Sequence, residues 1–365
     1  MVGQVGFSEA HLHPSEQVPS ATRRVPDRHP SSPRLSAAVV GRVITALLIV
    51  SPIAAIAVSV PLLWGHAIHL RDVVLAAILY AITGHGVTVG FHRLFTHRGF
   101  KPKRPLKIAL AIAGSMAIEG SVVSWVANHR RHHVHSDRSG DPHSPHTSPR
   151  GALGPVRGFL HAHMGWMFST DSTAPERYAA DVLRDRDLAA VSTLFPLWAV
   201  ASLALPFGVG WLWSGSLIGG LTAFVWAGII RMALLHHMSW SVNSICHMVG
   251  ARPFATDDQS RNVRLLALLS FGESWHNLHH AYPACARHGV GRGQIDSSAG
   301  IIRLFEKAGW ATNVRWPTAR RLVTLAATPA TPALVPVTRK EPVEQAGRLA
   351  SNRSPRSARS STTGA

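Results

Sequence analysis

The chain has 365 residues, and 37 Lys and Arg against 19 Asp and Glu give a formal charge of +18 with histidine counted as neutral. Because 46% of the residues are hydrophobic and only 15% are charged, the composition excludes a chain that is disordered throughout. Two cysteines are too few for a disulfide-stapled fold, and so apolar a composition argues against a nucleic-acid binder. The 23 histidines are the feature that needs an explanation.

Both ends of the chain are predicted to be disordered and basic. Residues 1–36 are rich in Pro, Ser, Arg and His, and they contain no short apolar core followed by a small-residue cleavage site, so we expect no signal peptide. Residues 318–365 are also basic and of low complexity. Residues 37–317 are therefore the expected folded domain.

Four apolar runs in this domain are long enough to cross a membrane as helices, since about 20 residues at about 1.5 Å each span a hydrocarbon core of about 30 Å. They cover residues 38–64, 73–91, 188–208 and 211–235. The short link at residues 209–210 predicts that the last two form a tight hairpin. A fifth run, residues 106–126, contains Glu119 and several Gly and Ser residues. We expect an interfacial or re-entrant helix there, because a crossing would separate the histidine clusters described below.

The charges of the loops predict the orientation in the membrane. Five cations follow the second run, namely Arg93, Arg98, Lys101, Lys103 and Arg104. The opposite loops carry little charge beyond Arg71, which Asp72 balances. By the positive-inside rule the basic side is cytoplasmic, and four crossings place both termini there as well. Much of the positive charge is thus a topology signal, with an added attraction to anionic lipid.

Three histidine clusters and an Asn–His pair fall on this side of the membrane. They are His92 with His97, His129 with His132 and His133, His276 with His279 and His280, and Asn243 with His247. Residues at i, i+3 and i+4 share a helix face, so each H-x2-H-H box can aim three imidazoles at one point. The H-x4-H pair fits an α-helix less well. Either His92 ends a helix and His97 lies in the turn beyond it, or the two face different metals.

Imidazole-rich clusters of this kind indicate metal binding. Neutral imidazole is a good ligand for iron, zinc and copper, and nine histidines exceed what one octahedral ion accepts, so two ions are implied. The lack of thiolates argues against Cys-type zinc sites and iron–sulfur clusters. A ferritin-like site needs two Glu-x-x-His motifs, and the boxes offer only Glu273 with His276. Ordinary interfacial roles are expected for His66, His69, His85, His236 and His237.

With these clusters in place, the chain resembles the membrane-bound fatty acid desaturases of the stearoyl-CoA (acyl-CoA delta-9) type, most closely the actinobacterial ones. The resemblance rests on GVTVGFHRLFTHRGF, WVANHRRHHVHSDRSGDPHS, SWSVNSICH and DDQSRNVRLLALLSFGESWHNLHHAYP, within residues 86–283. It implies an all-α membrane protein with four transmembrane helices and a cytosolic, histidine-rich di-iron helical cap, in a bacterial plasma membrane. It also implies O2-dependent insertion of a cis double bond, usually between carbons 9 and 10 of a saturated long-chain acyl thioester.

The resemblance assigns roles to single residues, and it implies no catalytic residue separate from the metal centre. Two Fe2+ ions would be held by His92, His97, His129, His132, His133, His247, His276, His279 and His280. Asn243 matches a position that reaches a metal through water. Asp141 and Glu273 fall at family positions where we expect hydrogen bonds that orient metal-bound imidazoles; a solvated acid or a helix cap is the alternative.

The substrate channel is less clearly marked in the sequence. Trp125, Phe95, Phe271 and Trp275 are candidate walls, although an aromatic residue in such a place is more often part of the core. Arg130 and Arg131, together with Lys101 and Lys103, are candidates for contact with a phosphorylated acyl carrier.

Two departures from the animal members leave the acyl carrier open. No basic pair follows His163-Met-Gly-Trp, and Ala127 stands where those enzymes have Arg. Acyl-CoA is the default substrate, with a chain on acyl carrier protein or on a lipid as the alternative. The tails are too short for a fused redox domain, so electrons are expected from a separate ferredoxin, cytochrome b5 or NADPH-dependent reductase.

Two other functions compete with desaturation. A membrane fatty acid hydroxylase or alkane monooxygenase would use a similar histidine iron site, but the box spacings and the DPH and NSxxH stretches favour a desaturase. A metal transporter or sensor would be expected to place its ligands near the membrane midplane, whereas these lie at and beyond the cytoplasmic helix ends.

Overall fold

The computed structural model describes residues 33–62, 69–147 and 151–326 of the chain. This part is almost entirely helical. Its longer elements are α1 (Pro33–Leu62), α2 (Leu70–His85), the π-helix η1 (Gly86–Thr96), α3 (Arg104–Ser115), α4 (Val122–His135), α5 (Gly154–His163), α8 (Arg186–Thr193), α9 (Phe195–Ser214), α10 (Leu217–Ala223), the π-helix η3 (Phe224–Ile230), α11 (Arg231–Met248) and α13 (Ser297–Lys307).

Short elements complete the described chain. They are the helical turns η2 (Gly165–Phe168), α6 (Pro175–Tyr178), α7 (Ala180–Arg184), η4 (Arg264–Leu266), α12 (His276–Ala281) and α14 (Ala319–Leu325), and the strands β1 (Lys101–Pro102) and β2 (Ala311–Thr312). The two strands pair antiparallel, with Lys101 opposite Thr312. This pairing ties the segment after η1 to the segment after α13.

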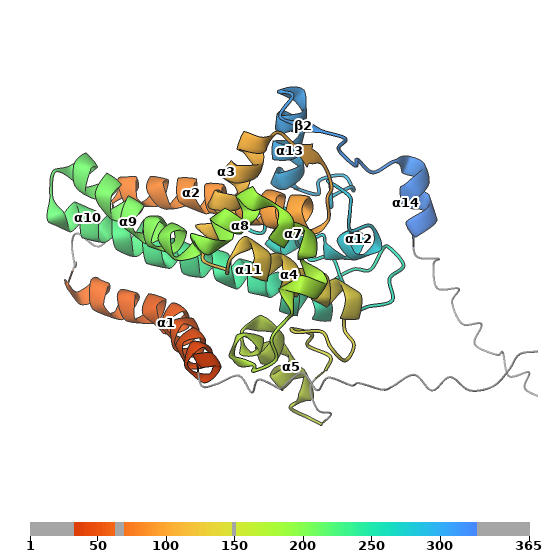
Figure 1. The fold of residues 1–365 in the computed structure, drawn as a ribbon, viewed down its shortest axis with the longest axis horizontal. Helices are drawn as coiled ribbons and strands as arrows, with labels where there is room; N and C mark the ends of the chain where they lie inside the picture. Colours follow the sequence, from red (N-terminus) through yellow and green to blue (C-terminus); the bar gives the residue numbers. More distant parts are fainter. Residues whose placement is uncertain (1–32, 63–68, 148–150, 327–365) are drawn as a thin grey trace, which may run out of the picture. The chain divides into compact units, whose positions relative to one another are not determined.

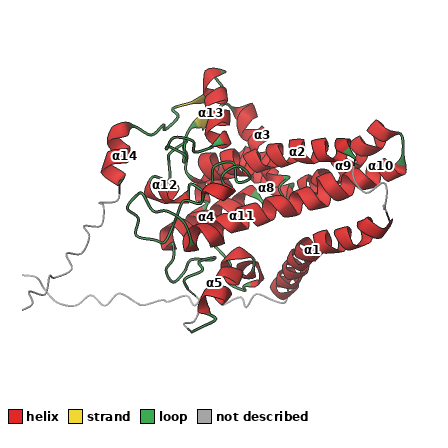
Figure 2. Ribbon diagram, turned by 180° about the vertical axis from the view of Figure 1, so that it is seen from behind, coloured by secondary structure: helices red, strands yellow, loops and turns green. Residues whose placement is uncertain are grey.

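Four helical segments are long and apolar enough to cross a membrane, as predicted. They are Val39–Ser59, Leu70–Thr96, Phe195–Ser214 and Leu217–Met248. Figures 1 and 2 show α2, α9 and the α10–α11 helix side by side, and α4 and α12 near the end where α11 stops. The protein is an integral membrane protein with an all-α core.

The predicted boundaries of the hairpin were wrong. The third span continues through Trp211 to Ser214 and ends where Gly215 adopts a left-handed conformation with φ of 66°. Ser216 then caps the next helix by accepting a hydrogen bond from the Gly219 N–H. The turn therefore lies at Gly215 and Ser216 instead of residues 209–210, because capping chemistry, and not the apolar run, ends the helix.

Helical structure extends beyond both predicted ends of the folded domain, residues 37 and 317. Helix α1 already begins at Pro33, and α14 lies inside the region predicted as a disordered tail. Thr318 caps α14, and Ala326 after it forms a bridge with Phe254. Residues 1–32 and 327–365, which hold the rest of the predicted tails, lie outside the described residues.

The fifth apolar run is not a candidate span, in agreement with the prediction. It forms α3 and the start of α4, joined by a turn. Helix α3 packs closely on η1. A Cβ at Gly86 would lie only 2.2 Å from the backbone nitrogen of Gly114. These two glycines let the backbones approach and hold η1 in place.

Candidate di-metal centre

The π-helix η1 explains the unusual H-x4-H spacing of the first box. The His97 N–H donates to the carbonyl oxygen of His92 at 3.2 Å, an i to i+5 bond that closes the last wide turn of the helix. Residues five apart then lie nearly above each other, which an α-helix does not allow. His97 follows the helix end, as expected, but His92 does not end the helix, because η1 continues to Thr96.

The structure brings the nine predicted histidines into two groups. A five-histidine group contains His92, His97, His129, His133 and His279, and a four-histidine group contains His132, His247, His276 and His280. In each group one ring nitrogen of every member lies within 4.8 Å of the others. Metal–nitrogen bonds of about 2.1 Å would put neighbouring ligands of an octahedral ion about 3 Å apart and opposite ligands about 4.2 Å apart. The spacing fits one ion in each group.

Two details refine the sequence-based prediction. His92 and His97 lie in the same group, which favours one shared ion over the alternative that they face different metals. Each H-x2-H-H box is divided between the groups: His129 and His133 lie in one and His132 in the other. Residues at i and i+4 are separated by a small angle on an α-helix, whereas the residue at i+3 points to the other side of that direction. A box therefore serves two neighbouring ions.

The chemistry of the rings supports a cation at the four-histidine group. His247 and His280 each direct Nδ1 at a carboxylate, and an imidazole with its single proton on Nδ1 carries a lone pair on Nε2. Both of these Nε2 atoms face Nε2 of His276, at 3.1 and 3.0 Å. One proton on His276 cannot satisfy two lone pairs. A metal ion between the rings would.

A carboxylate contacts Nδ1 of four of the nine histidines. The pairs are His92 with Glu273 at 2.5 Å, His132 with Asp141 at 3.0 Å, His247 with Asp137 at 2.8 Å and His280 with Asp258 at 2.5 Å. Asp141 makes the hydrogen bond that the sequence led us to expect, and Glu273 lies at ion-pair distance from His92. Each pair fixes the tautomer that leaves Nε2 free to bind a metal.

These carboxylates are ionised at neutral pH. Burial on its own would raise the pKa of Asp137, but hydrogen bonds from His247, Gln259 and Ser144 lower it to about 2. For Asp258, the opposing effect of burial is outweighed by the contact with His280, and its pKa is also lowered. For His280 burial acts in the other direction and lowers the pKa to about 4, so its ring is neutral and able to bind a metal.

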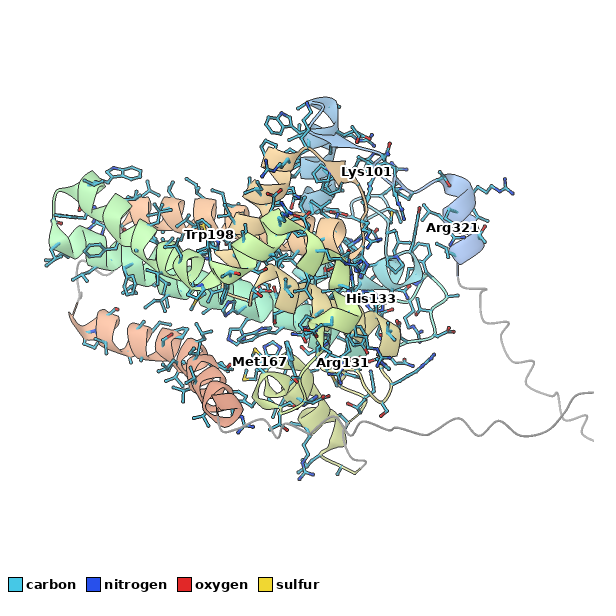
Figure 3. The ribbon with its side chains drawn as sticks, in the orientation of Figure 1. Lys101, Arg131, His133, Met167, Trp198 and Arg321 are labelled. Atoms are coloured by element: carbon cyan, nitrogen blue, oxygen red, sulfur yellow. The ribbon has the colours of Figure 1, made fainter. Side chains whose placement is uncertain are left out.

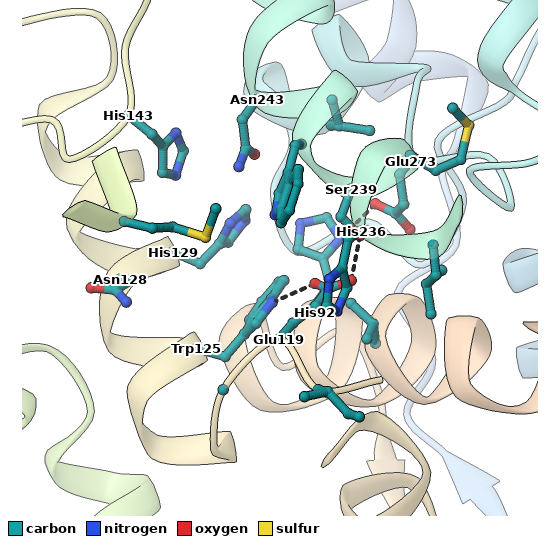
Figure 4. A pocket seen from close by; sticks show the side chains of 18 of the residues that line it. His92, Glu119, Trp125, Asn128, His129, His143, His236, Ser239, Asn243 and Glu273 are labelled. Atoms are coloured by element: carbon teal, nitrogen blue, oxygen red, sulfur yellow. Dashed lines mark hydrogen bonds and ion pairs between the residues drawn. The ribbon is translucent and has the colours of Figure 1, made fainter. Parts of the chain in front are cut away.

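A cavity of about 380 Å³ adjoins the two groups. Its walls are mostly apolar and include Ile44, Leu48, Val87, Ile118, Leu235 and Phe271. His92, His129 and His276 also line it, and Figure 4 shows Asn243 and His143 facing it above His129. Among the described residues, no Lys or Arg lines this cavity. An apolar molecule could thus reach the metal-binding rings.

Glu119 is a polar group in this wall that the sequence did not single out. Its carboxylate oxygens accept hydrogen bonds from Ser239 Oγ at 2.7 Å and from Trp125 Nε1 at 3.2 Å, as Figure 4 shows. Burial raises the pKa of Glu119 to about 7, despite both of these bonds. The bonds tie the α3–α4 turn to α11 across the cavity wall.

Only two of the four aromatic candidates line the cavity, namely Trp125 and Phe271. Trp275 does not, because its indole N–H donates to the Ile295 carbonyl at 2.7 Å and its ring lies against Gly289. Phe95 belongs to the buried core. Both side chains are used in packing away from this cavity, as large aromatic residues near a histidine box can be.

The cationic candidates for a phosphorylated carrier lie elsewhere. Arg130 donates to Asp181 and to three backbone carbonyls, and Arg131 pairs with Asp171. Neither lines the cavity. Lys103 lies over the ring of Trp310, and Figure 3 shows Lys101 well apart from His133.

The histidines expected to be ordinary have ordinary contacts where they are described. His85 bonds to the Ala81 carbonyl and Ser297 Oγ, and His69 caps α2 through its backbone N–H. His236 lines the cavity and bonds to the Ala117 carbonyl, and His237 bonds to His163. His66 lies outside the described residues.

The fold and the site together define an integral membrane protein with a histidine-rich di-metal site beside an apolar cavity. Residues 68–292, more than half of the chain, match the family model of the fatty acid desaturases. The chain belongs to that family.

Relatives with assigned activities agree. The chain is 38% identical over 266 residues to the hex-5-enoyl-[acyl-carrier protein] acetylenase of Moorena producens (strain JHB), covering 72% of this chain and 83% of that protein. It is 38% identical over 245 residues to delta-9 acyl-lipid desaturase 1 of Arabidopsis thaliana, covering 66% and 74%. It is 38% identical over 244 residues to the acyl-CoA C20 delta5-desaturase of Anemone leveillei, covering 66% and 72%. The names of these relatives include three kinds of acyl carrier.

Proposed function

We propose that this desaturase inserts a cis double bond near carbon 9 of a saturated long-chain acyl group. The reaction takes two hydrogens from adjacent CH2 groups and reduces O2 to two waters, with two further electrons and two protons from an external donor. The observation that carries the proposal is the apolar cavity on which His92, His129 and His276 open.

The two ions are proposed to be iron. All nine proposed ligands are imidazoles, and imidazole suits iron as well as zinc and copper. Two irons held there would supply the activation of O2 that an unactivated C–H bond requires, which no acid, base or nucleophile of the chain provides. The chain itself binds and orients the acyl group, and regioselectivity then depends on which carbons the cavity holds beside the histidines.

For the acyl carrier, the sequence takes CoA as the default, but two features of the cavity favour a lipid-borne chain. No Lys or Arg among the described residues lines the cavity, whereas a CoA carries several phosphate charges that need cations. One wall is formed by Ile44, Leu48 and Ile49 of the first candidate span. We propose that the acyl chain enters from the bilayer.

The metal centre is proposed to lie on the cytoplasmic side. Support comes from Arg98, Lys101, Lys103 and Arg104, which follow the second candidate span and are exposed or half-buried. The electron donor would be a separate ferredoxin, cytochrome b5 or NADPH-dependent reductase that docks on this side.

Expression in a host that lacks desaturase activity tests the proposal. Mass spectrometry of total fatty acids should show cis monoenes with the double bond mapped near carbon 9, and hydroxylated chains without olefin would identify a hydroxylase instead. To test the carrier, the purified enzyme is supplied with electrons and O2 and given either saturated phospholipid vesicles or stearoyl-CoA. Faster desaturation of stearoyl-CoA would overturn the lipid assignment and leave the desaturase assignment intact.

A further inference from the structure

Arg93 lies in the middle of the first histidine box and is completely buried, with 0% of its surface exposed. Its Nε donates to Glu273 Oε1 at 3.0 Å, and its Nη1 donates to Asp296 Oδ1 at 2.9 Å and to the Ala286 carbonyl at 2.9 Å. A buried guanidinium is tolerated where carboxylates compensate its charge. Arg93 is therefore held between two buried acids and does not act as a loop cation.

Asp296 is the far end of this arrangement. It caps α13 by accepting from the Ala299 N–H at 2.9 Å. Its other oxygen accepts from the backbone N–H groups of His288 and Gly289, at 2.7 and 3.1 Å. Asp296 thus binds three backbone N–H groups in two segments, as well as the side chain of Arg93.

The near end of the arrangement is a proposed metal ligand. Glu273 uses Oε1 for Arg93 and places Oε2 2.5 Å from Nδ1 of His92. His288 lies on the same side, with Nδ1 3.4 Å from Oε2 of Glu273. Since one oxygen is bound by the guanidinium, the carboxylate cannot rotate without breaking that pair. Its second oxygen therefore stays aimed at His92.

The backbone is shaped for this contact. Gly272, directly before Glu273, has φ of +97°, and a Cβ there would lie 2.6 Å from Asp296 Oδ1. Only glycine fits a left-handed position against a carboxylate at this distance. The turn that carries Glu273 and the start of α13 are thus built to touch.

We propose that Arg93 and Asp296 are positioning residues for the five-histidine group, acting on His92 through Glu273. The four-histidine group has separate partners, because the carboxylates at its rings are Asp137, Asp141 and Asp258. Loss of the Asp296–Arg93–Glu273 chain should weaken metal binding at one group and spare the other. The inference rests on the di-metal part of the proposed function, but not on the acyl reaction.

The test measures metal binding by the full-length protein in detergent. Apoprotein is titrated with Fe2+ under anaerobic conditions and in parallel with Co2+, and bound metal is quantified by mass spectrometry together with the Co2+ absorption spectrum. The decisive variants are Arg93→Lys, which keeps the charge but loses the forked donor, and Asp296→Asn, which can still cap α13. Arg93→Gln leaves two buried carboxylates without their cation and is expected to destabilise the whole chain. Arg93→Gln is included only for comparison, because Arg93→Lys should retain more bound metal than Arg93→Gln does.

Loss of a partner that orients a metal-bound imidazole typically weakens binding by about 10–100-fold. We expect about that loss for one of the two ions in Arg93→Lys and about tenfold in Asp296→Asn, with the second ion bound as in the wild type. In a His247→Ala background, which leaves the five-histidine group complete, the remaining ion should show the same loss.

Two control variants show whether the loss of metal binding is specific. Arg98→Gln removes a cation from the same segment, but Arg98 is exposed and pairs with Asp181, which Arg130 also holds, so both ions should bind normally. Asp137→Asn removes the partner of His247 and should weaken the other ion instead. The proposal is overturned if Arg93→Lys and Asp296→Asn bind both ions with wild-type affinity, or if they weaken both ions equally. A selective loss without acyl desaturation would contradict the proposed function and leave this inference standing.

Discussion

At the scale of single residues, the site depends on which ring nitrogen each histidine presents. Where a carboxylate contacts Nδ1, as Asp258 does in His280, the proton is held on that nitrogen and Nε2 faces the group. No carboxylate of the described residues contacts His133 in this way, and its Nε2 lies 2.9 Å from Nε2 of His279 within the five-histidine group. Metal binding is its proposed role.

His133→Ala should therefore abolish turnover while the protein still inserts in the membrane, because one of five donors is removed from a closely spaced group. Activity is measured as monoenes formed by the expressed variant, and bound iron by mass spectrometry. His135→Ala is the matched control, since His135 lies on the same helix outside both histidine groups and its Nε2 bonds to the Tyr178 hydroxyl. Substantial activity in His133→Ala would contradict the ligand assignment.

Glu119 should make stability fall as the pH rises. Burial raises its pKa from 4.5 to about 7, so the folded protein keeps a proton that the unfolded chain releases. The folded state is therefore favoured below about pH 4.5, and that contribution is lost as the pH rises through about 7.

Glu119→Gln removes this titration but can still bond to Trp125 and Ser239. The difference in thermal unfolding temperature between pH 5 and pH 8 should be smaller in the variant than in the wild type. The same difference in both proteins would show that Glu119 is not buried as described.

At the scale of elements, η1 is positioned by close contact with α3. A Cβ at Gly86 would meet the backbone of α3 at 2.2 Å, and backbone atoms cannot move aside as the end of a flexible side chain can. Since His92 follows on the same π-helix, a displaced η1 would move a proposed ligand.

Gly86→Ala should destabilise the protein by roughly 1–3 kcal/mol, the cost of forced overpacking, and should reduce bound iron. Gly208→Ala in α9 is the matched control, because a Cβ there meets nothing within 4 Å. It should be neutral or stabilise by up to about 1 kcal/mol through its helix propensity. Thermal unfolding in detergent measures both, and equal effects would contradict the packing of η1.

The sequence predicted elements well where apolar length decides and poorly where local hydrogen bonds decide. Four spans follow from hydropathy, but the end of α9 depends on Gly215 and the cap at Ser216, which the apolar run conceals. The π-helix was not predicted, since its i to i+5 bonds leave no periodic signal over so few residues. The H-x4-H spacing was its only trace.

The nine histidines of the site could be predicted from the sequence, but most of the carboxylates that contact them could not. Nine histidines stand in recognisable boxes, whereas Asp137 and Asp258 lie in loops whose paths the sequence does not give. Asp137 has a left-handed φ of 59°, and this turn brings its carboxylate back to His247. In the sequence Arg93 looks like one of several cations in a loop. Its contacts with two acids become visible only in the structure, where it is completely buried.

At the scale of the whole molecule, metal binding and folding should be linked. Without the ions, one proton on His276 leaves a buried Nε2 lone pair of the four-histidine group unsatisfied. A ligand held at 100 times its Kd stabilises a protein by about 2.7 kcal/mol. A chelator should therefore lower the thermal unfolding temperature of the wild type.

His276→Ala should show a smaller effect of the chelator, because it removes one ring of the four-histidine group. The variant is compared with wild type at equal protein and detergent concentration, with and without added Fe2+. An unfolding temperature of the wild type that does not respond to the chelator would contradict the coupling.

The length of the last span has a consequence for the route of the substrate. Leu217–Met248 has 32 residues, which at about 1.5 Å each make a rod of about 48 Å, or about 45 Å of height if it tilts by about 20°. A hydrocarbon core of about 30 Å covers only part of it. If the rod starts at the opposite surface, its end stands about 15 Å beyond the hydrocarbon core, and Asn243 and His247 lie in this protruding part. A lipid-borne acyl chain would then have to leave the hydrocarbon core to reach the histidine groups. The apolar cavity would provide a path for it that avoids water.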